Sequence, residues 1–227
     1  MGSFNNMILV DDWMAIQYDI ITTNPATGEA KKDTTMEFAR FGDYGELVAK
    51  VDEGWGGSRN DSYTGLLSFL TDEEKAAQNA FMQEIIDTQL PETDDLEAKY
   101  PVVYPTTIDT ELGQKMKKVI PQDFEAWNEG YDAWSEWADT FYTADAAYDL
   151  RGEVYDVNGL KTALKDSLDS VRRVCINNIL ISEDWAAVHF YTVETDAENH
   201  KDAFNHMQFL HFVEDGDGVK VDMCWAK

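Results

Sequence analysis

Cysteine, proline and long apolar runs are all scarce in this sequence of 227 residues. Only Cys175 and Cys224 are present, which excludes a disulfide network; two thiols in an intracellular-looking chain are expected to be reduced, a single structural disulfide being the alternative. No window approaches the ~20 apolar residues of a membrane span. The start, MGSFNNMILV, lacks the basic region and apolar run of a secretory signal. We therefore expect a soluble, cytoplasmic protein.

Basic residues are also few, 18 against 44 acidic ones, for a net charge of −26. This charge repels nucleic-acid phosphates and anionic lipids, so neither nucleic acid nor membrane is predicted as a partner. The acidic residues are spread along the whole chain, which favours a solubilising surface. A docking face for a basic partner is the alternative interpretation.

The sequence also lacks the usual motifs for metals and cofactors. There is no Cys-x-x-Cys pair, no phosphate-binding glycine loop and no Gly-x-Ser-x-Gly turn. All four histidines lie between positions 189 and 211. His206 and His211 are an odd number of residues apart on a predicted strand, so they point to opposite faces and cannot share an ion. Neither a metal nor a cofactor is predicted.

What the sequence does contain is an internal repeat. NNMILVDDWMAIQYD at 5–19 recurs as NNILISEDWAAVHFY at 177–191. Further along, Met36 and Phe38 align with Met207 and Phe209. Each copy has β-branched and aromatic residues in runs separated by turn signals such as NPATGE, which predicts four antiparallel strands joined by short turns.

Helical patterns precede the second copy. From Phe124, apolar residues recur in steps of three and four up to Phe141, which predicts one continuous helix. Asn158 is a candidate N-cap for a further helix with Leu160 and Leu164 on its apolar face. The predicted order for 122–227 is a long helix, two short strands, a helix and four strands.

This order, with FYTADAAYD after the first helix, VNGLKTALK in the capped helix and DGDGVKVDMCW near the end, resembles the SnoaL-like polyketide cyclases of the nuclear-transport-factor-2-like superfamily. The resemblance covers 122–227 fully and 4–57 as a strand half only. It implies an α+β fold, a cone-shaped curved antiparallel sheet covered by helices, as in cystatin-like proteins.

The predicted organisation is thus a duplication with an incomplete first copy. Residues 1–57 form the strand half of a first repeat, 58–121 a helical connecting segment packed on the first sheet, and 122–227 a complete domain. Either the first copy has lost its front half or the chain begins inside a longer protein.

The resemblance places any active site inside the cone. It implies that His206 and Gln208 face this interior, with His206 as a general acid or base, the alternative being a histidine hydrogen-bonded within the barrel. It also implies that His189 is a pocket residue. Asp222 lies near the family's acidic catalytic residue, although DMCWAK has Met223 and Cys224 where that pattern has Glu and His.

Large aromatic residues are predicted to line the cone. The predicted ligand-pocket residues are Trp127, Trp134, Phe141, Tyr148, Tyr155, Gln208, Leu210 and Trp225. As a set they also suit an ordinary hydrophobic core.

Two functions follow from the resemblance. The first is an enzyme that performs cofactor-free cyclisation, isomerisation or dehydration on a hydrophobic carbonyl compound, with His206, Asp222 and His189 as catalytic residues. The second is a non-catalytic ligand-binding or dimerisation module. The apolar rows at Met36 and Phe38 and at Met207 and Phe209 predict a sheet-face contact, either within the chain or in a homodimer.

Overall fold

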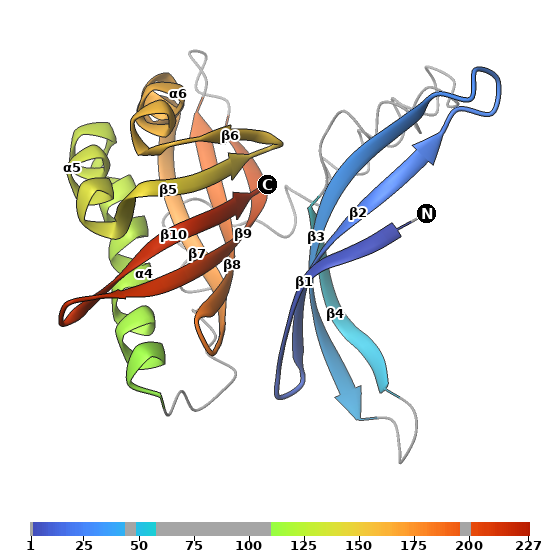
Figure 1. Ribbon diagram of the computed structural model, residues 1–227, viewed down its shortest axis with the longest axis horizontal. Helices are drawn as coiled ribbons and strands as arrows, with labels where there is room; N and C mark the ends of the chain where they lie inside the picture. Colours follow the sequence, from blue (N-terminus) through green and yellow to red (C-terminus); the bar gives the residue numbers. More distant parts are fainter. Residues whose placement is uncertain (1, 44–48, 58–109, 196–200) are drawn as a thin grey trace.

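The chain forms two antiparallel-based sheets, and helices cover one of them (Figure 1). The structure is a computed structural model that describes residues 2–43, 49–57, 110–195 and 201–227. The first sheet has the order β1-β2-β3-β4 and the second the order β6-β5-β10-β9-β8-β7. The strands of the first sheet are β1 (Gly2–Val10), β2 (Trp13–Thr23), β3 (Ala30–Asp43) and β4 (Ala49–Gly57). The later elements are α4 (Glu111–Glu129), α5 (Tyr131–Phe141), β5 (Tyr142–Leu150), β6 (Glu153–Tyr155), α6 (Val157–Ser170), β7 (Val171–Ser182), β8 (Trp185–Thr195), β9 (Lys201–Asp215) and β10 (Gly218–Ala226).

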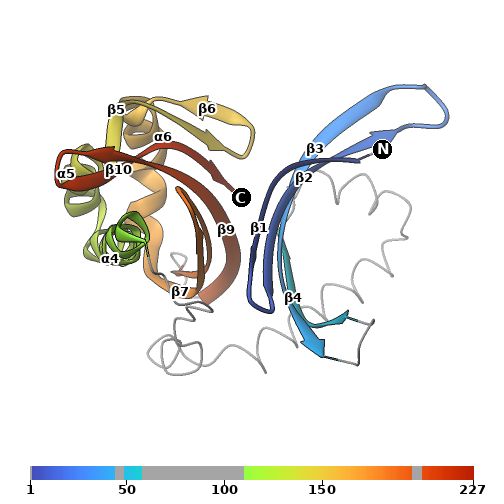
Figure 2. The same cartoon turned by 60° about the horizontal axis from the view of Figure 1, so that its bottom comes forward.

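The second sheet is strongly curved, and α4, α5 and α6 lie on its concave side (Figure 2). The predicted α+β fold is confirmed, because helices cover one face of a curved sheet. One pairing differs from the expected antiparallel pattern, because β5 runs parallel to β10. The helix α6 connects β6 to β7 at the opposite edge of the same sheet.

The helix boundaries differ from the sequence prediction in two places. Thr110 caps α4, its hydroxyl accepting a hydrogen bond of 3.0 Å from the backbone N–H of Gly113. The helix then continues through Pro121, so the predicted boundary between residues 121 and 122 falls inside α4. The single helix predicted from Phe124 to Phe141 is wrong, because Gly130, at φ 109°, separates α4 from α5.

The start of α6 also moves. Asp156, rather than Asn158, caps this helix, because its carboxylate accepts a hydrogen bond of 2.7 Å from the backbone N–H of Gly159. Leu160 and Leu164 point into the core, as their spacing predicts.

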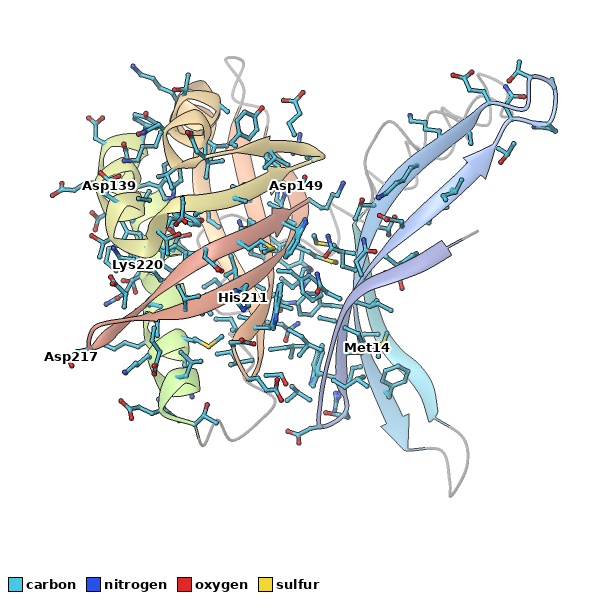
Figure 3. All side chains as sticks on the ribbon, viewed as in Figure 1. Met14, Asp139, Asp149, His211, Asp217 and Lys220 are labelled. Atoms are coloured by element: carbon cyan, nitrogen blue, oxygen red, sulfur yellow. The ribbon has the colours of Figure 1, made fainter. Side chains whose placement is uncertain are left out.

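The second sheet has a hydrophobic core on each of its faces. On the concave face, Val188 and Phe190 of β8 join the helices in the larger core. On the convex face, Ala187 of the same strand joins residues of the first sheet, and side chains fill both layers (Figure 3). This alternation follows from the two-residue period of a strand.

The predicted sheet-face contact forms within the chain. Met36 and Phe38 of the first sheet and Met207 and Phe209 of the second are all fully buried in one cluster. The expected helical packing of the connecting segment falls, for 58–109, outside the described residues. Among the helices that are described, none is long and apolar enough to cross a membrane.

Candidate functional site

The interior of the cone holds most of the residues predicted to line a pocket. Six of them have side chains buried between the helices and the concave face: Trp127, Trp134, Phe141, Tyr148, Gln208 and Leu210. Tyr155 is only partly buried at the edge of this core, and its hydroxyl donates to the exposed carboxylate of Glu153. Several of the aromatic pairs meet edge to face, as Trp127 and Trp134 do at 5.8 Å between centroids.

Gln208 and Tyr148 form a hydrogen-bonded polar pair within this apolar core. Gln208 of β9 is 1% exposed, and its Nε2 donates a hydrogen bond of 2.9 Å to the hydroxyl oxygen of Tyr148 on β5. The Cys224 thiol of β10 lies against the same hydroxyl. Burial holds the pKa of the Tyr148 hydroxyl and of the Cys224 thiol well above their ordinary values. Both groups are therefore neutral, and the thiol is not a nucleophile at neutral pH.

Asp123 of α4, which was not among the predicted site residues, adds a carboxyl group to this interior. Its side chain is 1% exposed, and burial raises its pKa to about 8. The indole N–H of Trp134 opposes this rise without reaching hydrogen-bonding geometry. Asp123 is thus mostly protonated at pH 7 and can both donate and accept a proton near neutral pH.

Unpaired polar atoms accompany Asp123. Among the described residues, no hydrogen-bond partner meets Oδ1 of Asp123, Nε1 of Trp127 or Trp134, or the hydroxyl of Tyr142. Tyr142 is close enough to Asp123 for the two to interact electrostatically. Buried polar groups are nearly always paired, with protein, ordered water or a ligand. This interior therefore contains several hydrogen-bond donors and a carboxyl oxygen that have no partner among the described residues.

His206 lies on the cone side of β9, as predicted, but near the rim. Its ring stacks on Phe190 with 5.2 Å between centroids. Its Nδ1 donates to the carbonyl oxygen of Lys227 at 3.2 Å, and its Nε2 accepts from the Thr192 hydroxyl at 2.9 Å. Burial lowers its pKa to about 4. A neutral ring with both nitrogens engaged is a poor proton shuttle at neutral pH, so these contacts fit the hydrogen-bonded alternative.

The prediction that His189 lies in the cone is wrong. This side chain is fully buried on the convex face, where its ring lies 5.5 Å from that of Phe38 in the first sheet. Asn177 Nδ2 donates to its Nδ1 at 2.8 Å. The placement follows from strand alternation, because Val188 and Phe190 on either side point into the cone.

Asp222 and Trp225 also lie outside the cone. A β-bulge between Val221 and Met223 leaves Asp222 as an extra residue opposite β9. The bulge reverses the alternation that begins with Val221, so Cys224 points into the cone and Trp225 packs beside the sheet-to-sheet core. The structure therefore separates His206 from both Asp222 and His189, and the predicted trio does not form one site.

On the convex side, Asp222 has a partner that sequence reasoning missed. His211 Nδ1 is 2.6 Å from Oδ1 of Asp222, and Nε2 is 3.2 Å from Oδ2 of Asp184. Figure 3 labels this histidine on β9. Burial lowers the pKa of His211, but the hydrogen bonds and charges of Asp222 and Asp184 outweigh it and raise the pKa overall. Its ring also lies 4.8 Å from that of Trp185.

Comparisons with known proteins give a fold likeness only. No family model and no curated protein matches the sequence. Among solved structures, a candidate polyketide cyclase from Bacillus cereus matches at 17% identity and a TM-score of 0.45, over 56% of this chain and 83% of that chain. A candidate hydroxylase from Streptomyces galilaeus matches at 16% and 0.44, over 52% and 90%. A cystatin-like protein from Caulobacter vibrioides matches at 13% and 0.41, over 52% and 89%. At these values the likeness carries no argument about function.

Proposed function

We propose that the cone between the second sheet and the helices α4, α5 and α6 is a small-molecule site. In this site Asp123 transfers protons to and from a hydrophobic carbonyl compound. The observation that carries the proposal is a fully buried carboxyl group with a pKa of about 8. A carboxyl group held near neutral pH in an apolar interior is a recurring device of acid–base enzymes. We assign the role of general acid and base to Asp123 instead of His206, because His206 is held neutral and both of its ring nitrogens are hydrogen-bonded.

The proposed chemistry needs no cofactor and no net redox change. As a carboxylate, Asp123 takes a proton from the carbon next to the carbonyl group, and as an acid it returns that proton to the same carbon or another one. The unpaired N–H groups of Trp127 and Trp134 and the Tyr142 hydroxyl would donate to the carbonyl oxygen as negative charge develops there. Isomerisation and the proton transfers of an aldol cyclisation or a dehydration all fit this arrangement.

The experiment is a titration of the protein with a panel of aromatic carbonyl compounds. Binding is followed by tryptophan fluorescence between pH 6 and 9, and turnover by loss of the compound. We expect saturable quenching and turnover by the unaltered chain. Asp123→Asn should still bind but lose about 100-fold or more of the turnover, whereas Asp145→Asn, at an exposed position on β5, should behave as the unaltered chain does.

A separate measurement isolates the carboxyl group itself. Titration of the Asp123 side-chain carbon by NMR should give a midpoint of about 8, and the signal should vanish in Asp123→Asn. A midpoint near the ordinary value of 3.8 would remove the basis of the proposal. Failure of every compound to change the fluorescence would count equally against it.

The alternative function, a non-catalytic module for ligand binding or dimerisation, is supported by the buried contact between the sheets. The two functions differ in turnover. If compounds bind with the same affinity to the unaltered chain and to Asp123→Asn, and neither converts them, the cone is a binding site without catalysis.

A further inference from the structure

The four-stranded sheet β1–β4, called the first unit below, and the four strands β7–β10, called the second unit, are equivalent strand by strand. Both run in sequence order and pair antiparallel to their neighbours. Two of their β-bulges coincide as well. The first strand of each unit has a bulge at the first Asn of its Asn-Asn pair, Asn5 and Asn177. The last strand of each has a bulge at the Asp of its Val-Asp pair, Asp52 and Asp222.

The turns and the residues around them correspond too. The first turn of each unit has a residue with positive φ, Asp11 at 52° and Glu183 at 54°. The next residue accepts a backbone hydrogen bond from the third strand: Phe41 donates to Asp12 at 2.7 Å, and Phe212 donates to Asp184 at 2.8 Å. Such matching local geometry shows that the two units are built to one plan.

The same plan governs the contact between the sheets. Five residues of the first sheet in the shared core have their exact counterparts in the second unit, packed in or against the same core. The pairs are Ile8 with Leu180, Trp13 with Trp185, Ala15 with Ala187, Met36 with Met207 and Phe38 with Phe209. Each unit therefore presents an equivalent surface to the other, with one difference: Val10 of the first sheet belongs to the shared core, and its counterpart Ser182 does not.

Three contacts between strands of the two sheets have the matching symmetry, whereas the contact of β4 with β9 has no equally close counterpart between β10 and β3. β1 contacts its own counterpart β7, and it also contacts β8, while β2 contacts β7. Exchanging each strand for its counterpart turns the β1–β8 contact into the β7–β2 contact. A surface that packs against an equivalent copy of itself in this way is the definition of an isologous contact, the kind that builds two-fold dimers.

We infer that the convex face of the second unit is a self-recognition surface, filled within the chain by β1–β4 and able to bind a second copy of the chain when β1–β4 is displaced. The chain is in effect a dimer joined into one polypeptide. Its partner is a sheet carrying the same Met-x-Phe row. This inference is independent of the chemistry proposed for the cone.

The test uses the full chain and a measurement of mass in solution by light scattering. Phe38→Asp places a charge in the shared core on the first sheet and should displace it. The freed face around Phe209 should then pair with that of a second chain, giving twice the 25.8 kDa of one chain. Adding Phe209→Asp should return the mass to that of the unaltered protein. Met7→Asp, at a position 57% exposed on β1, is the control and should leave the mass unchanged.

Two results would overturn the inference: an unchanged mass for Phe38→Asp, or a doubled mass that persists in the double variant. Circular dichroism shows whether the variants are folded. Should Phe38→Asp be unfolded, the unaltered chain supplies the decision. Isotope-labelled and unlabelled chains are unfolded together, refolded at high concentration and examined by native mass spectrometry. Dimers of mixed label support the inference, and their absence contradicts it.

Discussion

At the scale of single residues, His211 and Arg40 lie at equivalent positions, and each lies beside an aspartate carboxylate. Arg40 Nε lies 2.9 Å from Oδ2 of Asp12, and His211 occupies the equivalent place beside Asp184. The first sheet uses a cation whose charge is permanent, whereas the second uses one that titrates. The second unit should therefore depend on pH at a point where the first does not.

We expect His211 to stabilise the fold below about pH 6.5 and progressively less above it. Its pKa is raised in the folded state, so the folded chain holds a proton that the unfolded chain releases, and stability falls as the pH rises through the folded pKa. The contribution is about 1 kcal/mol, as for a partly exposed ion pair. His211→Arg, which copies position 40, should remove this part of the loss and leave the part due to Asp123, whose pKa is also raised in the folded state. Urea unfolding midpoints at pH 5.5, 7 and 9 measure this loss of stability. An equal decline of the midpoint in the unaltered chain and in His211→Arg would contradict the role of His211.

The burial of Asp123 could have been predicted from the sequence. It lies three positions after Ile120 and four before Trp127, both buried, so it falls on the apolar face of α4. A carboxyl group at such a position is a signal that periodicity alone makes visible. The apolar pattern that predicts the helix begins at Phe124, so Asp123 lies just before the predicted helix.

At the scale of elements, two of the failed predictions result from backbone irregularities. Trp225 would point into the cone if β10 continued the alternation of Val219 and Val221, both of which do. The bulge at Asp222 adds one residue and reverses the faces beyond it. A bulge of this kind leaves no mark in an apolar pattern, because Cys224 and Trp225 are both acceptable core residues.

Gly130 is the other such irregularity. Its φ of 109° and ψ of 179° belong to a region that side-chain-bearing residues avoid. Gly130→Ala should therefore destabilise the fold by about 1–3 kcal/mol, although nothing lies within 4 Å of the added Cβ. Gly218→Ala is the control, because no unusual φ is recorded there and the nearest atom is 3.5 Å away. Unfolding midpoints compare the two, and equal losses would rule out a strained helix junction.

At the scale of the whole molecule, the fold was predictable and the site was not. The repeat and the amphipathic helices determine a curved sheet with a covered face, because each apolar stripe must be buried. The apolar rows at Met36 and Phe38 and at Met207 and Phe209 also predicted the contact between sheets. Which histidine faces the cone depended on single-residue alternation. The cluster around Asp123 depended on four elements meeting in space, α4, α5, β5 and β10, which no local pattern encodes.

The second sheet is covered on both faces, by helices on one side and by the first sheet on the other. Strands β8 and β9 are also interior within it, so water reaches their amides only when both coverings open. We expect their backbone hydrogens to exchange with deuterium more slowly than those of any other described strand, at the rate of global unfolding. Edge strands β1 and β6 should exchange fastest. Mass-spectrometric exchange resolves this ranking, and rapid labelling of Val188 to Phe190 would mean that the two layers separate readily in solution.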